Sequence, residues 1–391
     1  MPSVGSESTL TVAARLEKTI TSNVSIRHER TFAEIERLSS AGLEGTELLQ
    51  RVARTLRRAI PFDAYCASTT DPATNLMTRG IAEGFIEDDE AGNVFFDYVY
   101  FEEDLDQTIS MARRNRPVQL LSETTEGKLE RSLRYRELLR PQGLGHELGG
   151  AFIDGGLWGG MDLMREMGSS DFTSREVALM KRIAPHVGAG LRTAALYSRA
   201  VTDQDTPDLP GVLTLDRDGT VLSHTPPALR WLEDLEDLHP AWRENDPPIP
   251  VRMVAGALQR SLSPASGGDA NFVPRVRVRG RSGRWITLHG SLTEPADGRP
   301  SETVVVIEPA SAQDVAWLNA ASYGLSPRED EIVKLVARGF STRRISQTLF
   351  ISEYTVQRHL QNAFEKVGVK SRRELVKRLF LENLLPGMIT E

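Results

Sequence analysis

Residues 325–373 read, in four blocks, Leu325-Ser-Pro-Arg-Glu, Gly339-Phe-Ser-Thr-Arg-Arg-Ile-Ser, Ile351-Ser-Glu-Tyr-Thr-Val-Gln-Arg-His-Leu and Lys366-Val-Gly-Val-Lys-Ser-Arg-Arg. Each block carries a start or stop signal of a short helix, and apolar residues recur between the blocks at helical spacing. The stretch therefore predicts three short helices, of which the last two are joined by a tight turn.

The first of these helices has a full set of terminal signals. Ser326 is a favourable N-cap, Pro327 suits the first helical position, and Glu329 stands where a capping box places its acidic residue. Gly339 ends the helix, because glycine accepts the left-handed conformation that is common after a helix C-terminus.

The second and third helices begin at hydroxyl residues. Ser341 or Thr342 caps the second helix, Ser352 caps the third, and Gly368 closes the third. The apolar residues of the three helices recur at helical spacing, so we expect them in one core: Ile332, Val333, Leu335, Val336, Ile345, Leu349, Val356, Leu360, Phe364 and Val367.

The outer face of the third helix is polar and basic. Two helices joined by a short turn can place the second one in the major groove, where Gln pairs with adenine and Arg with guanine or phosphate. The residues expected to meet the groove are Thr355, Gln357, Arg358 and Gln361. Those expected to hold phosphates, which position a protein without reading sequence, are Thr342, Arg343, Lys366, Lys370 and Arg372.

Residues 322–387 resemble the LuxR-type (GerE-like) helix-turn-helix domain. The resemblance rests on the Leu-Ser-Pro-Arg-Glu block, the Gly-Phe-Ser turn, Thr-Val-x-x-His and Lys-x-Gly-Val-x-Ser-Arg, all at matching spacing. It implies binding to double-stranded DNA. In that family the residue after Thr-Val is commonly Lys and touches bases, whereas this chain has Gln357, so the preferred DNA sequence stays open.

The family also dimerises through a fourth helix, which here would span Ser371 to Leu385. Its apolar stripe consists of Leu375, Leu379, Phe380 and Leu384. These side chains can complete the core of a four-helix module, form a dimer contact, or do both, and the resemblance favours a homodimer. The predicted long helix from Ser174 to Leu196 is another surface through which two sensors could pair.

The charge distribution supports a DNA-binding end on an acidic body. Residues 326–380 hold twelve Lys and Arg against six Asp and Glu, a net charge of +6. The whole chain carries −7, which leaves −13 for the rest. This asymmetry is expected when only one domain meets phosphate.

Length and composition limit what the rest of the chain can form. A chain of 391 residues is too long for one core and suggests two or three domains. The sequence has no run of 18 apolar residues, and its first residues lack the basic and apolar blocks of a signal peptide, so we expect no membrane span. The single cysteine, Cys66, fits a reducing cytoplasm and is expected to fill space in a strand rather than react.

The region 31–198 resembles a GAF domain, a sensory module with an antiparallel sheet and a ligand pocket. Two helices broken by glycines precede a strand at Phe62 to Thr69, and Gly149 to Arg165 reads as a hairpin turning at Asp154-Gly-Gly. Phe172 and Glu176 then open a long helix. The resemblance implies a pocket between the sheet and its covering helices, with Tyr65, Phe152, Trp158 and Met161 as candidate lining residues, although ordinary core packing is the simpler role for each of them.

The region 207–309 resembles a PAS domain. It follows a Pro- and Asp-rich break and reads as two strands, small helices and three strands, with Asp216-Arg-Asp-Gly as a turn. Arg275, Arg277 and Arg279 alternate with Val, which places three cations on one strand face. A solvated face is the expected role of these cations, and an anion site or a partner's acidic surface is the alternative.

The sequence does not indicate a particular cofactor. The Asn-Cys-Arg motif of flavin-binding PAS domains is absent, and the seven histidines are scattered without a metal-binding spacing. No nucleophile elbow, Walker loop, Cys/His cluster or Glu-x-x-His pair appears, so we expect no enzyme. The signatures of a phosphorylated receiver are also absent.

The sequence thus predicts an α+β multidomain protein: an arm or helix (1–30), a GAF-like sensor (31–198), a PAS-like domain (207–309), a connecting helix (310–321) and an all-α LuxR-type domain (322–391). The predicted function is a cytoplasmic, ligand-responsive transcription regulator that binds DNA as a homodimer and contacts RNA polymerase if it activates. An autoinducer-type LuxR regulator is a rival, although its Trp-x-x-x-Tyr and Asp-Pro signature is absent. The other alternative is a sensory scaffold that binds protein instead of DNA. Ligand, target genes and the direction of regulation stay open.

Overall fold

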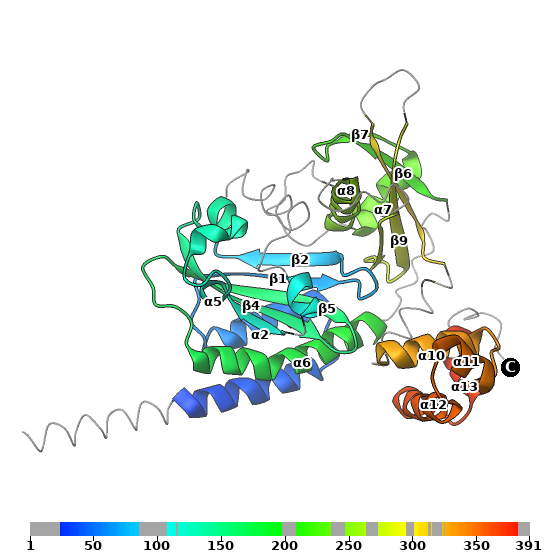
Figure 1. The fold of residues 1–391 in the computed structure, drawn as a ribbon. Helices are drawn as coiled ribbons and strands as arrows, with labels where there is room; N and C mark the ends of the chain where they lie inside the picture. The colour runs from blue at the N-terminus through cyan, green and yellow to red at the C-terminus, as the bar shows by residue number, and fades with distance from the viewer. Residues whose placement is uncertain are drawn as a thin grey trace, which may run out of the picture.

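The computed structural model describes residues 24–85, 108–114, 116–197, 209–235, 247–262, 273–294, 301–311, 314, 323 and 325–381. Two five-stranded antiparallel sheets come first along the chain, and a group of short helices follows (Figure 1). The order of elements matches the predicted mixed helix and antiparallel-sheet class with an all-helical C-terminal part.

The first sheet has the strand order β2-β1-β5-β4-β3. Its strands are β1 (Ala64–Thr70), β2 (Met77–Glu83), β3 (Val118–Leu120), β4 (Leu144–Ile153) and β5 (Leu157–Glu166). β4 and β5 form the hairpin predicted at Asp154-Gly-Gly, and β5 returns to pair with β1. β2 and β3 were not predicted from the sequence.

Two helices cover one face of this sheet, α2 (Gly45–Leu56) and α6 (Ser174–Tyr197), and the helix of residues 24–39 lies along α6 (Figure 1). Apolar side chains of these helices and of β1, β4 and β5 form one buried cluster. The shorter helices of this part are α4 (Thr108–Arg113), α5 (Leu121–Thr124), η1 (Leu129–Arg131) and η2 (Tyr135–Leu139).

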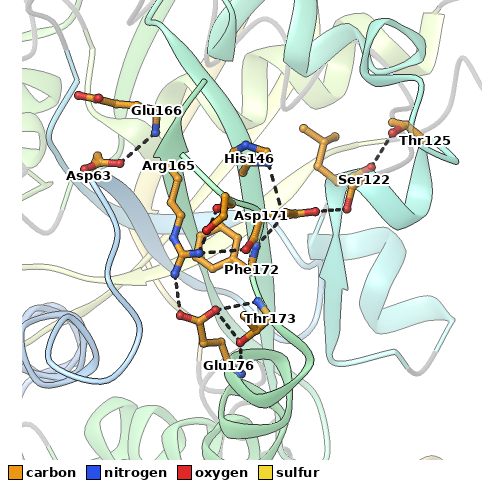
Figure 2. Close-up of polar contacts among 12 residues, drawn as sticks. Asp63, Ser122, Thr125, His146, Arg165, Glu166, Asp171, Phe172, Thr173 and Glu176 are labelled. Carbon is orange, nitrogen blue, oxygen red and sulfur yellow. Dashed lines mark hydrogen bonds and ion pairs between the residues drawn. The ribbon is translucent and has the colours of Figure 1, made fainter. Parts of the chain in front are cut away.

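Arg165 of β5 fixes the start of α6 (Figure 2). Its guanidinium donates a 2.6 Å hydrogen bond to Glu176 and another to the carbonyl oxygen of Asp171, and it lies over the Phe172 ring at 4.1 Å. Glu176 in turn accepts from the backbone N–H of Thr173 at 2.7 Å. The helix start predicted from Phe172 and Glu176 is therefore confirmed, and it is attached directly to the sheet.

The second sheet repeats the same pattern, with the order β7-β6-β10-β9-β8. Its strands are β6 (Gly211–Leu215), β7 (Val221–His224), β8 (Arg275–Arg279), β9 (Trp285–Leu292) and β10 (Thr303–Pro309). The helices α7 (Pro226–Leu235) and α8 (Ile249–Leu262) pack against this sheet. The order of these elements is the predicted one, with two strands, then helices, then three strands.

The two sheets share an apolar junction. Leu76 and Met77, from the β1–β2 hairpin of the first sheet, belong to the hydrophobic cluster of the second sheet and α8. α8 packs on β2 as well as on β8 and β9, and a Cβ added at Gly80 would lie 3.2 Å from Ile249. The first two units therefore meet through buried side chains.

The predicted solvated face of arginines on β8 is wrong for Arg277. The side chain of Arg277 is 12% exposed and pairs with Asp71 at 3.3 Å and Asp314 at 3.0 Å. The Arg279 side chain donates to the carbonyl oxygen of Gly283, and only Arg275 is largely exposed. The alternation of the residues placed the three cations on one face, but it gave no sign that the first sheet covers that face.

The C-terminal helices are α10 (Pro327–Ala337), α11 (Thr342–Leu349), α12 (Glu353–Val367), α13 (Arg372–Val376) and η4 (Lys377–Leu381). Ser326 and Glu329 form the predicted capping box, with Pro327 inside the first turn. Gly339 and Gly368 adopt the left-handed conformation, with φ of 81° and 73°. These helices bury their own hydrophobic cluster, which includes Leu375 and Leu379.

Parts of the predicted organisation lie outside the described residues. They are most of the N-terminal arm, most of the linker predicted at 205–210, most of the connecting helix and residues 382–391, which include Leu384. Within the described ranges, no helix is long and apolar enough to cross a membrane.

Candidate nucleic-acid interface

The helix α12 presents the predicted reading face. Its N-cap Ser352 accepts a 3.0 Å hydrogen bond from the backbone N–H of Thr355. Apolar residues at helical spacing turn one side into the domain core: Val356, Leu360, Ala363 and Val367 are buried. Gln357, Arg358 and Gln361 are exposed on the remaining surface, and Thr355 is half-buried against its cap. The helix therefore offers amide and guanidinium groups that can bind base edges.

Thr342 joins three of the predicted DNA contacts. Its hydroxyl Oγ1 accepts a 3.1 Å hydrogen bond from Nε2 of Gln357 and a 2.7 Å bond from Nη2 of Arg372. Arg372 also donates to the carbonyl oxygen of Phe340 at 3.2 Å, and burial lowers the pKa of this arginine. The start of α11, the reading helix and the start of α13 are thus held together at one hydroxyl.

Two further predicted cations point away from the fold. Arg343 on α11 and Arg358 on α12 are exposed, and no side-chain hydrogen bond or ion pair to another described residue holds either of them. Lys370 is also exposed, and its backbone N–H donates to Glu374 at 2.9 Å. These three cations can meet phosphate without breaking an existing ion pair.

Lys366 stands in a different position. Its ammonium lies 2.7 Å from the Glu329 carboxylate, which also accepts from the backbone N–H of Ser326. Desolvation by burial raises the pKa of Glu329, but the bonds from Lys366 and Ser326 outweigh it and hold that pKa below its ordinary value. Lys366 therefore braces the capping box of α10, and a phosphate would have to compete with a buried carboxylate for it.

Two aromatic side chains near the reading helix escaped the sequence analysis. Phe350, in the left-handed conformation between α11 and α12, is 94% exposed, and Tyr354 in the first turn of α12 is 78% exposed. Tyr354 is four residues before Arg358 and shares its side of the helix. These residues are recognised by the exposure of large apolar side chains beside a polar face, and that exposure can be seen only in the folded structure.

Comparison with known proteins agrees with this geometry. The family model of the bacterial regulatory proteins of the LuxR family matches residues 323–379. Residues 323–379 form a helix-turn-helix domain of the LuxR family. The match covers α10, α11, α12 and α13 and every predicted DNA contact.

Curated relatives match over a short part of the chain. The oxygen regulatory protein NreC of Staphylococcus aureus is 39% identical over 75 residues, which is 19% of this chain and 35% of NreC. The chain thus spans about a third of the length of the curated relatives it matches.

Solved structures overlap only loosely. SdiA of Escherichia coli covers 91% of this chain and 98% of its own at 12% identity, with a TM-score of 0.31. The complex of phage VqmA with DPO covers 46% of this chain and 87% of its own at 15% identity, with a TM-score of 0.26. These superpositions do not establish a shared overall arrangement.

The predicted ligand-lining residues lie together in the first sheet unit. Tyr65, Phe152, Trp158 and Met161 are all buried in the cluster under α2 and α6. Trp158 donates from its indole N–H to the carbonyl oxygen of Asp154 at 2.9 Å. Close packing in the core explains why these four side chains are buried. That they line a ligand pocket stays a prediction.

A polar cluster on the first sheet was not predicted. The buried Arg134 donates from Nε to both carboxylate oxygens of Glu147 at 3.0 Å, and its Nη2 lies 3.5 Å from Asp162 and 3.7 Å from the Cys66 sulfur. Burial raises the pKa of the Cys66 thiol, with the Asp162 charge acting in the same direction. Cys66 is therefore an un-ionised thiol inside a charged network rather than only an apolar filler.

No metal centre emerges from the described part of the chain. The His, Cys, Asp and Glu side chains placed by the structure form no group of three or more that could hold an ion.

Proposed function

We propose that this protein is a cytoplasmic transcription regulator that reads double-stranded DNA with α12 and responds to a signal through the two sheet-containing units. The observation that carries the proposal is the exposed face of Gln357, Arg358 and Gln361 on the second helix of a LuxR-family helix-turn-helix. Arg343, Lys370 and Arg372 lie near this face and would hold phosphates, and the Thr342 hydroxyl accepts from both Gln357 and Arg372. RNA polymerase would be a partner if the protein activates transcription.

The sensor role rests on the architecture of the first two units. We assign residues 31–198 to a GAF-like unit and 207–309 to a PAS-like unit, because each has a five-stranded antiparallel sheet with helices on it. Such units take small molecules in many regulators.

Homodimerisation is proposed through the C-terminal end of the LuxR domain or through α6. Leu375 and Leu379 are fully buried in the domain's own cluster, so a contact at this end has to use other side chains. An HTH dimer binds two half-sites about one helical turn apart, which predicts a palindromic target.

A protein-binding role is the second candidate, and the exposed Phe350 and Tyr354 favour it. Apolar side chains beside a polar face are common at protein interfaces. Replacing Phe350, which lies outside α12, by Ala separates the two functions, because a DNA reader keeps its preference for the selected sequence, whereas a protein-binding scaffold loses its partner.

The test is selection of bound sequences from a random duplex library by the full chain. Recovery of one palindromic motif supports the proposal. The same selection with Gln357→Ala and Arg358→Ala should lose the motif, while Gln347→Ala on the exposed side of α11 serves as the control for surface substitution. Enrichment of no motif at any salt concentration would leave the protein-binding role as the better account.

A further inference from the structure

Asp71 is a buried carboxylate at the tip of the β1–β2 hairpin. Its Oδ1 accepts a 2.9 Å hydrogen bond from the backbone N–H of Ala73, and this bond closes the turn. Its Oδ2 accepts from the backbone N–H of Arg277 at 2.9 Å and from Nη1 of Arg277 at 3.3 Å. Burial raises the pKa of Asp71, and Arg277 opposes that rise. Contact with Arg277 is thus the main compensation for a carboxylate that water does not reach.

Arg277 also binds the segment that leads toward the LuxR domain. Its Nε donates to Oδ1 of Asp314 at 3.0 Å. One guanidinium on β8 therefore serves two carboxylates, one from the first sheet unit and one from the segment after β10. Leaving a buried charge without its partner costs free energy. If either carboxylate is displaced, the Arg277 side chain therefore has to move with it.

Asp314 and Ser311 bond to each other in the reciprocal pattern of a capping box. Its Oδ2 accepts from the backbone N–H and the hydroxyl of Ser311, and its own backbone N–H donates to the Ser311 hydroxyl at 3.2 Å. Desolvation raises the pKa of Asp314, but the bonds from Ser311 and Arg277 outweigh it and leave the carboxylate ionised. Arg275 lies 3.5 Å from the same carboxylate. The cap thus depends on a charge that the arginines of β8 hold in place.

The hairpin that carries Asp71 is seated in the second unit. Leu76 and Met77 enter the second hydrophobic cluster, and Arg79 donates to the carbonyl oxygen of Arg279 at 3.0 Å. The turn at Asp71 cannot shift independently of β8 while these contacts are kept. A change in the first sheet that moves β1 and β2 is therefore transmitted to Arg277.

We propose that Asp71, Arg277 and Asp314 form a relay in which the β1–β2 turn of the first unit controls the capped segment at Ser311 and Asp314. When Asp71 holds Arg277, the guanidinium is oriented for Asp314 and the cap is closed. When the turn moves, Arg277 follows or loses its order, and the cap opens. Asp314 precedes the LuxR domain in the sequence, so the state of this cap bears on the connection to that domain.

Amide hydrogen exchange on the full chain tests the relay without DNA. Asp71→Asn keeps the shape and one acceptor of the side chain but removes its charge. We expect it to raise the exchange rate of the backbone amides of Ser311 and Asp314 by roughly threefold or more, since hydrogen bonds to charged groups are the stronger ones. Coupling is reciprocal, so Asp314→Asn should raise exchange at Ala73 and Asn75.

Asp216 supplies a matched control. Its carboxylate also closes a hairpin turn, accepting from the backbone N–H groups of Asp218 and Thr220 at 2.9 and 2.8 Å, but it does not contact Arg277. Asp216→Asn should leave the cap at Ser311 unchanged. If Asp71→Asn fails to fold, Arg277→Lys keeps the charge and loses the geometry that serves two carboxylates, and it should loosen both ends together.

Equal exchange at Ser311 in the Asp71 and Asp216 variants would overturn the relay, as would loosening in one direction only. The part concerning DNA rests on the proposed function, and it predicts that Asp71→Asn changes the affinity of the full chain for its selected site. If exchange shows the coupling but no variant binds DNA, the relay stands and the proposed function fails.

Discussion

The capping box of the LuxR domain gives a prediction whose sign depends on pH. Glu329 is buried, and its carboxylate binds Lys366 and the Ser326 backbone. Glu329→Gln keeps the shape and an acceptor for Ser326 but loses the charge. A hydrogen bond to a charged group contributes about 1.5–3 kcal/mol. Because Lys366 is partly exposed and solvent screens the pair, we expect a loss of about 1 kcal/mol at pH 7.

The pH dependence follows from the direction of the pKa shift. The folded-state pKa of Glu329 lies below its ordinary value of 4.5, so the carboxylate contributes stability above pH 4.5 that is lost as pH falls through the folded-state pKa. Gln does not titrate. The difference in stability between the native sequence and Glu329→Gln should therefore be present at pH 7 and shrink toward zero in acid.

Urea unfolding of residues 322–391, followed by far-ultraviolet circular dichroism between pH 3 and 7, measures this difference. Glu331→Gln is the control, because Glu331 pairs with Arg328 on the exposed surface and should cost at most about 0.5 kcal/mol. A loss at pH 7 that persists unchanged at pH 3 would refute the reasoning, since it would come from packing and not from charge. The variant also releases Lys366, so its DNA binding should become more sensitive to salt.

Three further predictions concern the interface and the thiol. Arg358→Ala should weaken binding to the selected site by about 1–3 kcal/mol and relax its sequence preference, whereas Arg343→Ala should weaken binding to all duplexes alike, both measured by fluorescence anisotropy. Thr342→Val should destabilise the LuxR domain by about 1–2 kcal/mol in urea unfolding, because it removes the acceptor of two hydrogen bonds, while Thr348→Val, whose hydroxyl bonds within its own helix, should change stability by at most about 0.5 kcal/mol. Cys66 should react with a maleimide only after unfolding, since it is buried and its pKa is raised, and rapid labelling of the native chain would contradict its placement.

Local signals in the sequence predicted the local structure well. The structure confirms the predicted helix caps and helix-ending glycines, which are Ser326, Ser341, Ser352, Gly339 and Gly368. Such signals act within one turn of helix, so they need no knowledge of the rest of the fold. The strands of the second sheet were predicted for the same reason, because turn residues and alternation are also local.

Contacts between distant segments could not be predicted in this way. Glu329 on another helix binds Lys366, a contact that the sequence did not indicate, and the phosphate role of Lys366 stays a prediction. Arg277 was expected in solvent, but Asp71 and Asp314 meet it. A cation looks the same in sequence whether its partner is water, phosphate or a carboxylate brought there by folding. The buried Arg134 was missed for the same reason.

The central claim is that the LuxR domain of this chain reads DNA, and a salt titration of binding tests it most directly. The full chain and residues 322–391 would be titrated against the selected duplex and a scrambled one. With Arg343, Lys370 and Arg372 on phosphates, we expect a slope of log K against log salt of roughly −3 per domain, together with a preference for the selected duplex that survives high salt. Equal binding to both duplexes, or binding that salt does not affect, would contradict it.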